Sequence, residues 1–290
     1  VKALNEVLNQ LLDFRDDTFL IGQGVNSPWY AGQSTPGLFE KYGDNKVFDT
    51  PISENGLTGA AIGSALAGMR PIVFQSRMDF MLYSMDQIVN QAASWHYMFG
   101  KQINVPLTIW AVINRGGQQG AQHSQALQSI FAHIPGIKVV MPSNAYDVKG
   151  LLHSSVLDNN PVLFIDERWL YSSEMDVPEE LYTVPIGKGK LVREGKDLTV
   201  VATSYMVSQS LEAVEQIKEE KDTDVEVIDL RTVKPFDREI IYKSIKKTGR
   251  LLIVDAAWKS FGIGAEISAS VVEEQFKSLK YPIERLSLPD

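Results

Sequence analysis

The apolar run PLTIWAVIN at residues 106–114 is the feature that most constrains the fold of this chain. It has the length of a strand and almost no polar side chains, which is typical of a strand buried on both faces of its sheet. Similar short runs lie at residues 18–22, 70–76, 138–141 and 162–166. The helices expected between them cover residues 1–15, 56–69, 81–99, 124–133 and 145–157. This alternation predicts an α/β fold, with a mainly parallel sheet flanked by helices.

The second half of the chain repeats the pattern on a smaller scale. Strands are expected at residues 198–203, 225–230, 251–255 and 283–288, with helices between them. The stretch before them is rich in charges, prolines and glycines, which indicates a connection. The sequence therefore predicts two domains, residues 1–180 and 198–290, joined by a linker at 181–197. The second domain shows no catalytic constellation, so assembly is its expected role. The chain ends at Asp290 directly after a predicted strand, which leaves open a further C-terminal segment.

The composition excludes several classes of function. The net charge is -8 and no dense run of Lys and Arg occurs, which argues against nucleic acid or an anionic membrane as the main partner. Without cysteine the chain has no disulfide, catalytic thiolate or cysteine-bound zinc. No apolar stretch reaches the roughly 18 residues of a membrane span, and no signal peptide is visible, although a removed leader is left open. The expected compartment is the cytoplasm, or the mitochondrial matrix if the source is eukaryotic.

A lone carboxylate, Glu54, stands between a predicted strand end at residues 47–48 and the helix at 56–69, which is rich in glycine and alanine. Each glycine costs such a helix about 1 kcal/mol relative to alanine, so something must come close to its backbone. One interpretation is a tight helix-helix contact within the fold or a dimer. The other is that Glu54, partly desolvated at the junction, exchanges a proton with a heteroaromatic ligand.

Further candidate residues follow neighbouring strands. His123 lies on a glycine-rich loop, where it can transfer protons or simply bond to backbone. Phe80 can offer an apolar face to an aromatic ring or belong to the core, and Arg115 can meet an anionic group or a neighbouring carboxylate. Because ligands bind at the carboxyl ends of parallel strands, we expect Glu54, Phe80 and the loop at 115–123 to meet on one rim.

Other motifs are absent. His96 and His153 fall inside predicted helices and His133 at a helix end, and no pair of histidines has metal-ligand spacing. No GxxxxGK[ST] loop or G-x-G-x-x-G turn occurs, which argues against nucleotide binding of those kinds. No G-x-S-x-G occurs either, so a serine triad is unsupported.

Several longer motifs occur together and in order. They are DTPISENG (49–56), AGMRPI (67–72), MDF (78–80), MDQIVNQAA (85–93), GAQHSQ (120–125), PGIKVVMPSNAYDVKGLL (135–152), DNNPV (158–162), VIDLRTVKPFD (227–237) and FGIGAEI (261–267). Read together they resemble the beta subunit of thiamine-diphosphate-dependent 2-oxo-acid dehydrogenases, a branch of the transketolase-like superfamily. That group includes the first components of pyruvate and branched-chain 2-oxo-acid (2-oxoisovalerate) dehydrogenases. The resemblance covers nearly all of the chain.

The resemblance implies a pyrimidine-binding domain followed by a transketolase C-terminal domain, and an oxidoreductase acting on 2-oxo acids. It implies that Glu54 bonds the aminopyrimidine nitrogen of thiamine diphosphate, that Ile52 contacts the cofactor, and that Phe80 stacks on the pyrimidine ring. It further implies that His123 serves proton transfer during decarboxylation or transfer of the acyl unit to a lipoyl group. A potassium ion is implied as well, bound by backbone carbonyls and polar groups that map to Val112, Ser155, Asp158 and Asn160.

The family also implies partners. Its diphosphate and magnesium are held by a GDG segment followed about thirty residues later by a paired asparagine, and the alpha subunit supplies both. In this chain the fragments Gly43-Asp44 and Asn159-Asn160 are far too distant from each other. We therefore expect an alpha partner, a two-alpha, two-beta assembly with each site between unlike chains, and a lipoyl acyltransferase as the acyl acceptor.

The sequence departs from the family pattern at three places. Gln23 and Gly24 stand where acidic residues are usual, which puts proton communication between the two sites in doubt. QSRMDF (75–80) replaces the usual E-F-x-x-F-[DN]-F, and Arg77 would alter the charge beside the cofactor ring if its side chain points inward. The loop before His123 is also shorter than usual. Two alternatives stay open: the C-terminal half of a split transketolase-like enzyme, and a non-catalytic assembly subunit. The sequence does not name the 2-oxo acid.

Overall fold

The computed structural model describes residues 1–27, 29, 31–117 and 119–290. The chain forms two compact units, one of residues 1–140 and 144–186, the other of residues 141–143 and 187–290. Each unit has a mainly parallel sheet with helices on its faces, so the predicted α/β class is confirmed. No helix in these described ranges combines the length and the hydropathy needed to cross a bilayer.

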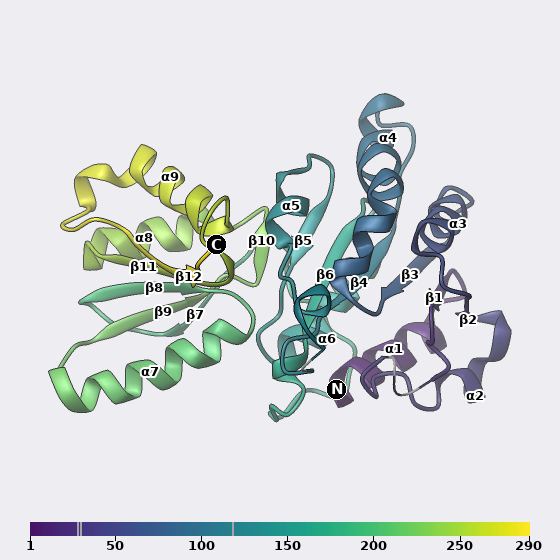
Figure 1. Ribbon diagram of the computed structural model, residues 1–290, viewed down its shortest axis with the longest axis horizontal. Helices are drawn as coiled ribbons and strands as arrows, with labels where there is room; N and C mark the ends of the chain where they lie inside the picture. Colours follow the sequence, from purple (N-terminus) through teal and green to yellow (C-terminus); the bar gives the residue numbers. More distant parts are fainter. Residues whose placement is uncertain (28, 30, 118) are drawn as a thin grey trace. The chain divides into compact units, whose positions relative to one another are not determined.

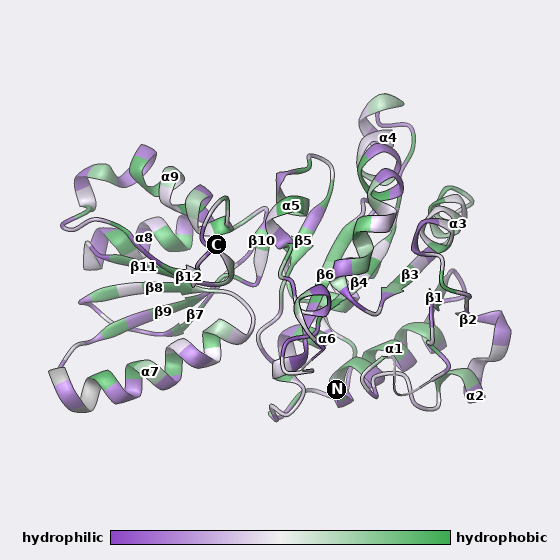
Figure 2. Ribbon diagram, in the orientation of Figure 1, coloured by the Kyte–Doolittle hydropathy of each residue, from purple (hydrophilic) through white to green (hydrophobic). Residues whose placement is uncertain are grey.

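The sheet of the first unit is parallel throughout. Its strands are β1 (Thr18–Gly22), β2 (Val47–Asp49), β3 (Arg70–Gln75), β4 (Thr108–Ile113), β5 (Lys138–Val140) and β6 (Val162–Glu167). They lie in the order β5-β6-β4-β3-β1-β2. Every residue of β4 is buried, as the apolar run predicts. Figure 2 shows the hydrophobic colouring concentrated on these inner strands.

Helices cover both faces of this sheet (Figure 1). They are α1 (Lys2–Phe14), α2 (Leu38–Tyr42), α3 (Glu54–Leu66), α4 (Ala93–Met98), α5 (Gln128–His133) and α6 (Ala145–Leu157). The leucine face of α1 packs with α6 against β1, β3 and β4, around Phe74 and Trp110. On the opposite face, α3 and the segment leading to α4 lie against β3. Both faces of the central strands are therefore buried from solvent, which accounts for their unbroken apolar sequence.

Two predicted helices are shorter and less regular than expected. The segment predicted as one helix at residues 81–99 is a 3-10 helix (Met78–Ser84), a π-helix (Asp86–Ala92) and then α4. In the π-helical part, the Ser94 hydroxyl donates to the Val89 carbonyl five residues back, at 2.8 Å. The segment predicted at 124–133 is helical only from Gln128, after a 3-10 turn at Ala121–His123. The apolar spacing of the sequence does not distinguish such short irregular turns from an α-helix. They are common beside functional sites.

The second unit has the sheet order β12-β11-β8-β9-β7. Its elements are β7 (Lys190–Arg193), β8 (Leu198–Ala202), α7 (Tyr205–Lys221), β9 (Val225–Asp229), β10 (Thr232–Lys234), α8 (Arg238–Thr248), β11 (Leu251–Trp258), α9 (Ile263–Gln275) and β12 (Glu284–Leu288). Valines of α7, β8 and β9 form its core. The linker predicted at 181–197 is wrong where it includes β7, which pairs antiparallel with β9. This edge strand is charged and largely exposed, so it carries no apolar signal.

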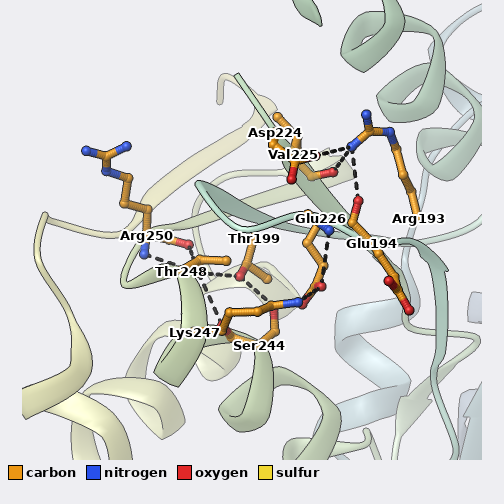
Figure 3. Close-up of polar contacts among 11 residues, drawn as sticks. Arg193, Glu194, Thr199, Asp224, Val225, Glu226, Ser244, Lys247, Thr248 and Arg250 are labelled. Atoms are coloured by element: carbon orange, nitrogen blue, oxygen red, sulfur yellow. Dashed lines mark hydrogen bonds and ion pairs between the residues drawn. The ribbon is translucent and has the colours of Figure 1, made fainter. Parts of the chain in front are cut away.

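Polar side chains within the second unit satisfy one another (Figure 3). The Thr199 hydroxyl on β8 bonds those of Ser244 and Thr248 on α8, at 2.6 and 2.7 Å. The buried Glu226 carboxylate on β9 pairs with the Lys247 ammonium on α8. These contacts fasten α8 to the sheet, and their groups are engaged in structural bonds rather than gathered for chemistry.

Candidate active site

A cleft of about 690 Å³ opens in the first unit where β1, β2, β3 and β4 end. The residues that line it come from the segments that directly follow these four strands, as expected for a parallel sheet. They include Gln23, Ile52, Glu54, Arg77, Phe80, Gln119 and His123. The structure therefore brings together the four residues expected to contact the cofactor or the reacting atoms, although they are spread over more than seventy positions of the sequence.

Glu54 is the first residue of α3 and is half-buried at the wall of this cleft. The loop before it is fixed to β1, because the Asp49 carboxylate accepts a hydrogen bond from the Gly24 backbone N–H and the Thr50 N–H donates to the Gly22 carbonyl. Gly24 has a φ of +69°, which suits glycine. Within the described part of the chain the Glu54 carboxylate has no hydrogen-bond or ion-pair partner, so its oxygens are free to meet a ligand.

Helix α3 begins two residues earlier than predicted and ends at Leu66 instead of residue 69. Ser53 directly precedes it, but its side chain makes no cap hydrogen bond. A Cβ on Gly59 would lie 3.4 Å from the Gln87 side chain, whereas a Cβ on Gly63 would meet nothing within 4 Å. The close contact expected for this glycine-rich helix therefore exists within the described chain at Gly59 and not at Gly63.

Phe80 and His123 face each other across the cleft. Their ring centroids are 5.2 Å apart and the rings are almost perpendicular, at 84°. Both rings are only partly buried, and the Nδ1 atom of His123 is inaccessible to solvent and has no hydrogen-bond partner among the described residues. A flat apolar face and an unpaired imidazole nitrogen thus line the same space, which suits a heteroaromatic ligand with a reacting group beside it.

Asp79 holds the loop that carries His123. Its Oδ1 accepts hydrogen bonds from the backbone N–H of Gln125 at 3.2 Å and from the Gln125 side-chain amide at 2.8 Å. The Asp79 side chain is buried, and its other oxygen has no partner among the residues that the structure describes. Sequence reasoning treated MDF only as a motif for Phe80 and missed this contact; the signal available was an acidic residue inside an apolar turn.

Arg77 also lines the cleft, so its side chain points toward the site, which was the condition for its charge to act there. Its Nε and Nη2 donate to the Gln119 side-chain oxygen at 3.1 and 2.8 Å, and its Nη1 donates to the Ser76 carbonyl at 2.5 Å. Burial, followed by the nearby positive charge of Arg168, lowers the pKa of the Arg77 guanidinium. Gln119, which sequence reasoning missed, additionally accepts from the Asn114 amide at 2.6 Å.

The remaining candidates lie elsewhere. His96 and His153 hold backbone carbonyls through Nδ1, those of Ile103 at 2.8 Å and Tyr182 at 2.9 Å. Arg115 donates to the Ser124 carbonyl at 3.2 Å and lies over the Trp169 ring. Gln118, inside the same glycine-rich loop, lies outside the described residues.

Of the four residues mapped to potassium, three lie together: the Asp158 backbone N–H donates to the Ser155 carbonyl, and the Asp158 carboxylate accepts from the Asn160 N–H. Val112 lies apart from them. Asp158 and Asn160 lie just before Val162, the first residue of β6, whereas Val112 on β4 lies beside Asp166 near the other end of β6. Val162 and Asp166 are four residues apart, which is about 13 Å along the strand. The Asp158 carboxylate already pairs with the Lys138 ammonium, and the Asp158 carbonyl accepts from Arg70 at 3.0 Å. Two cations thus contact oxygens of Asp158, and the Ser155 hydroxyl donates to the Leu151 carbonyl.

Comparisons with known proteins identify the family of this chain. Residues 1–173 match the family described as "Transketolase, pyrimidine binding domain", and residues 187–290 match "Transketolase, C-terminal domain". The pyruvate dehydrogenase E1 component subunit beta of Rickettsia conorii is 40% identical over 289 residues, which cover 100% of this chain and 88% of that protein. This chain belongs to the E1 beta-subunit family. The resemblance inferred from the motifs is thereby confirmed.

Other members of the E1 beta-subunit family have different names. The acetoin:2,6-dichlorophenolindophenol oxidoreductase subunit beta of Cupriavidus necator is 41% identical over 297 residues, covering 99% of this chain and 87% of that protein. The pyruvate dehydrogenase E1 component subunit beta-1, mitochondrial, of Arabidopsis thaliana is 40% identical over 292 residues, covering 99% and 80%. Among solved structures, a split-gene transketolase described as an inactive beta4 tetramer has a TM-score of 0.83 at 21% identity, covering 99% of this chain and 88% of that one. This last likeness shows the fold alone.

Proposed function

We propose that this chain is the beta subunit of a 2-oxo-acid dehydrogenase and forms the pyrimidine half of a thiamine diphosphate site. The observation that carries the proposal is the convergence of Glu54, Phe80 and His123 on one cleft at the carboxyl ends of β2, β3 and β4. The names of the relatives support it, since both pyruvate dehydrogenase and acetoin oxidoreductase beta subunits are about equally similar to this chain.

The cleft suits the pyrimidine end of thiamine diphosphate. Glu54 supplies a carboxylate that no described residue engages, and Phe80 supplies a partly exposed ring. His123 supplies a buried Nδ1 without a partner among the described residues, which a bound group would satisfy. Ile52 is largely exposed on the same wall and offers an apolar contact. A cluster of this kind is costly to leave unpaired in a folded protein unless a ligand completes it.

Each residue then has a separate task. Thiamine diphosphate, when bound, supplies the nucleophilic carbon and the electron sink for decarboxylation. Glu54 holds a proton at the aminopyrimidine nitrogen, which fixes the tautomer of that ring. Phe80 packs against the ring and excludes water from one of its faces. His123, whose ring is held edge-to-face against Phe80, gives or takes a proton at the oxygen of the substrate or the acyl group.

The remaining parts of the site come from other chains in this proposal. An alpha subunit holds the diphosphate and magnesium, since the glycine-aspartate and asparagine segments for that purpose are missing from this sequence. The active unit is a two-alpha, two-beta tetramer, and a lipoyl acyltransferase receives the acyl group. We place it in the cytoplasm, or in the mitochondrial matrix of a eukaryotic source.

Glu54→Gln tests the proposal. In the complex with the alpha subunit, thiamine diphosphate and magnesium, this substitution removes the proton-holding group while keeping the shape of the side chain. Because a positioned acid-base group contributes about 100- to 10,000-fold, we expect the release of carbon dioxide from a 2-oxo acid to fall by at least about 100-fold. The assay follows reduction of 2,6-dichlorophenolindophenol, and size-exclusion chromatography verifies that the complex still assembles.

Glu40→Gln is the matched control, because Glu40 is an exposed carboxylate on α2, away from the cleft. It should retain wild-type turnover and assembly. Near-normal turnover by Glu54→Gln would exclude the proposed role. A wild-type complex that assembles but turns over no 2-oxo acid would instead favour the assembly-subunit alternative.

A further inference from the structure

Arg77 is a cation in the cleft, and no carboxylate of the described residues pairs with it. None of the described residues forms an ion pair with it, and the oxygens that it contacts are those of Gln119 and the Ser76 backbone, which are neutral. Three of the five guanidinium N–H groups make these bonds, so two remain. A half-buried cation bonded only to neutral groups keeps most of its positive charge available to an incoming anion.

The surroundings keep the Arg77 guanidinium in place rather than neutralising it. Gln119 accepts from Arg77 and also from the Asn114 amide, and the Asn114 oxygen in turn accepts from Arg168 at 2.8 Å. Two arginines are thus joined through two neutral amides. The negative charge of Asp79 acts on Arg77, but the bonded oxygen of Asp79 is committed to Gln125. The cleft therefore presents a fixed positive charge on the wall formed by the residues that follow β3.

The charge of this arginine limits which anion it can serve. In an oxidative decarboxylation the carboxylate next to the oxo group loses its charge as carbon dioxide leaves. An arginine bound to that carboxylate would stabilise the substrate more than the transition state and would slow the reaction. A carboxylate elsewhere on the substrate keeps its charge throughout, so an arginine bound to it assists binding without opposing the chemistry. Guanidinium and carboxylate are also matched in geometry for two parallel hydrogen bonds.

We propose that Arg77 selects a substrate with a second carboxylate, so that the preferred donor is a 2-oxo dicarboxylic acid. The inference rests on the proposed function and deepens it by naming the substrate class. The relatives are named for pyruvate and for acetoin, and neither of these compounds has a second carboxylate. The role of Arg77 is substrate discrimination, since it lines the same cleft as Glu54 and His123 and takes no part in the proton transfers assigned to them.

The test compares two acids that differ only at the far end, 2-oxoglutarate and 2-oxopentanoate. Both are assayed with the alpha–beta complex loaded with thiamine diphosphate and magnesium. The wild-type complex should have a kcat/KM for 2-oxoglutarate at least about 10-fold above that for 2-oxopentanoate. In Arg77→Gln this ratio should fall by about 10- to 100-fold, the loss typical of removing a hydrogen bond to a charged group. The change should lie in KM for 2-oxoglutarate rather than in kcat.

Two further measurements separate this role from a structural one. Glutarate, which lacks the oxo group, should inhibit the wild-type complex more strongly than pentanoate, and Arg77→Gln should abolish that difference. Arg77→Lys, which keeps the charge and loses the planar fork, should restore part of the preference. Arg238→Gln is the matched control, because Arg238 is a half-exposed arginine on α8 in the second unit; it should leave the ratio at the wild-type value.

The outcomes distinguish this inference from the proposed function. If the assembled complex turns over no 2-oxo acid, the proposed function fails. If it turns over 2-oxopentanoate or pyruvate but does not prefer the dicarboxylate, or if Arg77→Gln leaves the ratio unchanged, only the inference is overturned. If Arg77→Gln prevents association with the alpha subunit, the missing carboxylate belongs to that partner, and the substrate assignment is again overturned.

Discussion

At the scale of single residues, the cleft depends on neutral amides and one buried acid that hold the reactive groups in place. Asp79 and Gln125 are 46 positions apart, yet two hydrogen bonds join them and fix the loop that ends at Gln125. His123 lies two residues before Gln125, and its ring packs against Phe80, the neighbour of Asp79. Asp79 thus ties the Phe80 turn and the His123 loop together, and we regard it as a positioning residue.

Substitution of Asp79 should separate positioning from charge. Asp79→Ala removes the acceptor for both Gln125 donors, so the His123 loop loses its anchor and kcat for the 2-oxo acid should fall by about 10- to 100-fold. Asp79→Asn keeps an oxygen that can accept from Gln125 and should restore most of kcat. Steady-state kinetics of the alpha–beta complex over a range of pH make the comparison.

A comparison of three variants distinguishes positioning by Asp79 from a direct role of its charge. Gln125→Ala should resemble Asp79→Ala, because it removes the same bonds from the other side. If Asp79→Asn is as impaired as Asp79→Ala, or shifts the pH profile of kcat, the negative charge itself acts in the site and positioning is not its main task.

At the scale of secondary structure, the sequence predicted those elements whose side chains are buried in a regular pattern. Strand β4 and its neighbours β3 and β6 carry unbroken apolar runs because both of their faces are covered, and they were predicted closely. Strand β7 was missed because it is exposed at a sheet edge, and β10 because only two residues separate it from β9. The π-helix at Asp86–Ala92 keeps helical spacing, so periodicity could not reveal it.

The same reasoning explains which site residues were found. Glu54, Phe80 and His123 were predicted because they follow strands and because a family resemblance points to them. The contacts of Asp79 with Gln125 and of Arg77 with Gln119 join residues more than forty positions apart, so one sequence gives no sign of them. Val112 lies apart from the other three residues mapped to potassium for a related reason: a one-residue mapping ignores which end of a strand each residue occupies.

A buried lysine fixes α1 onto the first unit. The Lys149 side chain on α6 is fully buried, and its ammonium pairs with the Glu6 carboxylate and donates to the carbonyls of Pro178 and Glu179 at 2.6 and 2.9 Å. Lys149→Met should lower the free energy of unfolding by about 2 to 4 kcal/mol, because the Glu6 carboxylate and two backbone carbonyls lose their charged donor. Urea titration of the isolated chain, followed by circular dichroism, gives the value.

Glu6→Gln provides the comparison. The Glu6 side chain is 41% exposed, so water can replace its contact and the loss should stay within about 1 kcal/mol. Equal losses for the two variants would mean that the ion pair with Glu6, and not the two carbonyl contacts at residues 178 and 179, supplies the stability.

At the scale of the whole molecule, the proposed function gives this chain half of a cofactor site. The cleft has groups for a heteroaromatic ring, and its sequence has no matched segment for a diphosphate and a divalent cation. A ring held by one carboxylate and one aromatic contact gains little binding free energy beside a diphosphate with its metal. The affinity for thiamine diphosphate should therefore belong to the assembly of the two kinds of subunit.

Thermal unfolding tests this division. Because a ligand stabilises the state that binds it, thiamine diphosphate at 100 times its Kd adds about 2.7 kcal/mol, which raises Tm by several degrees for a protein of this size. We expect that rise, with magnesium present, for the alpha–beta complex and no measurable rise for the isolated beta chain. In a complex made with Glu54→Gln the rise should be smaller but still present, since the diphosphate contacts remain. An equal rise for the isolated chain and the complex would mean that this polypeptide binds the whole cofactor, and the requirement for an alpha subunit would then have to rest on catalysis alone.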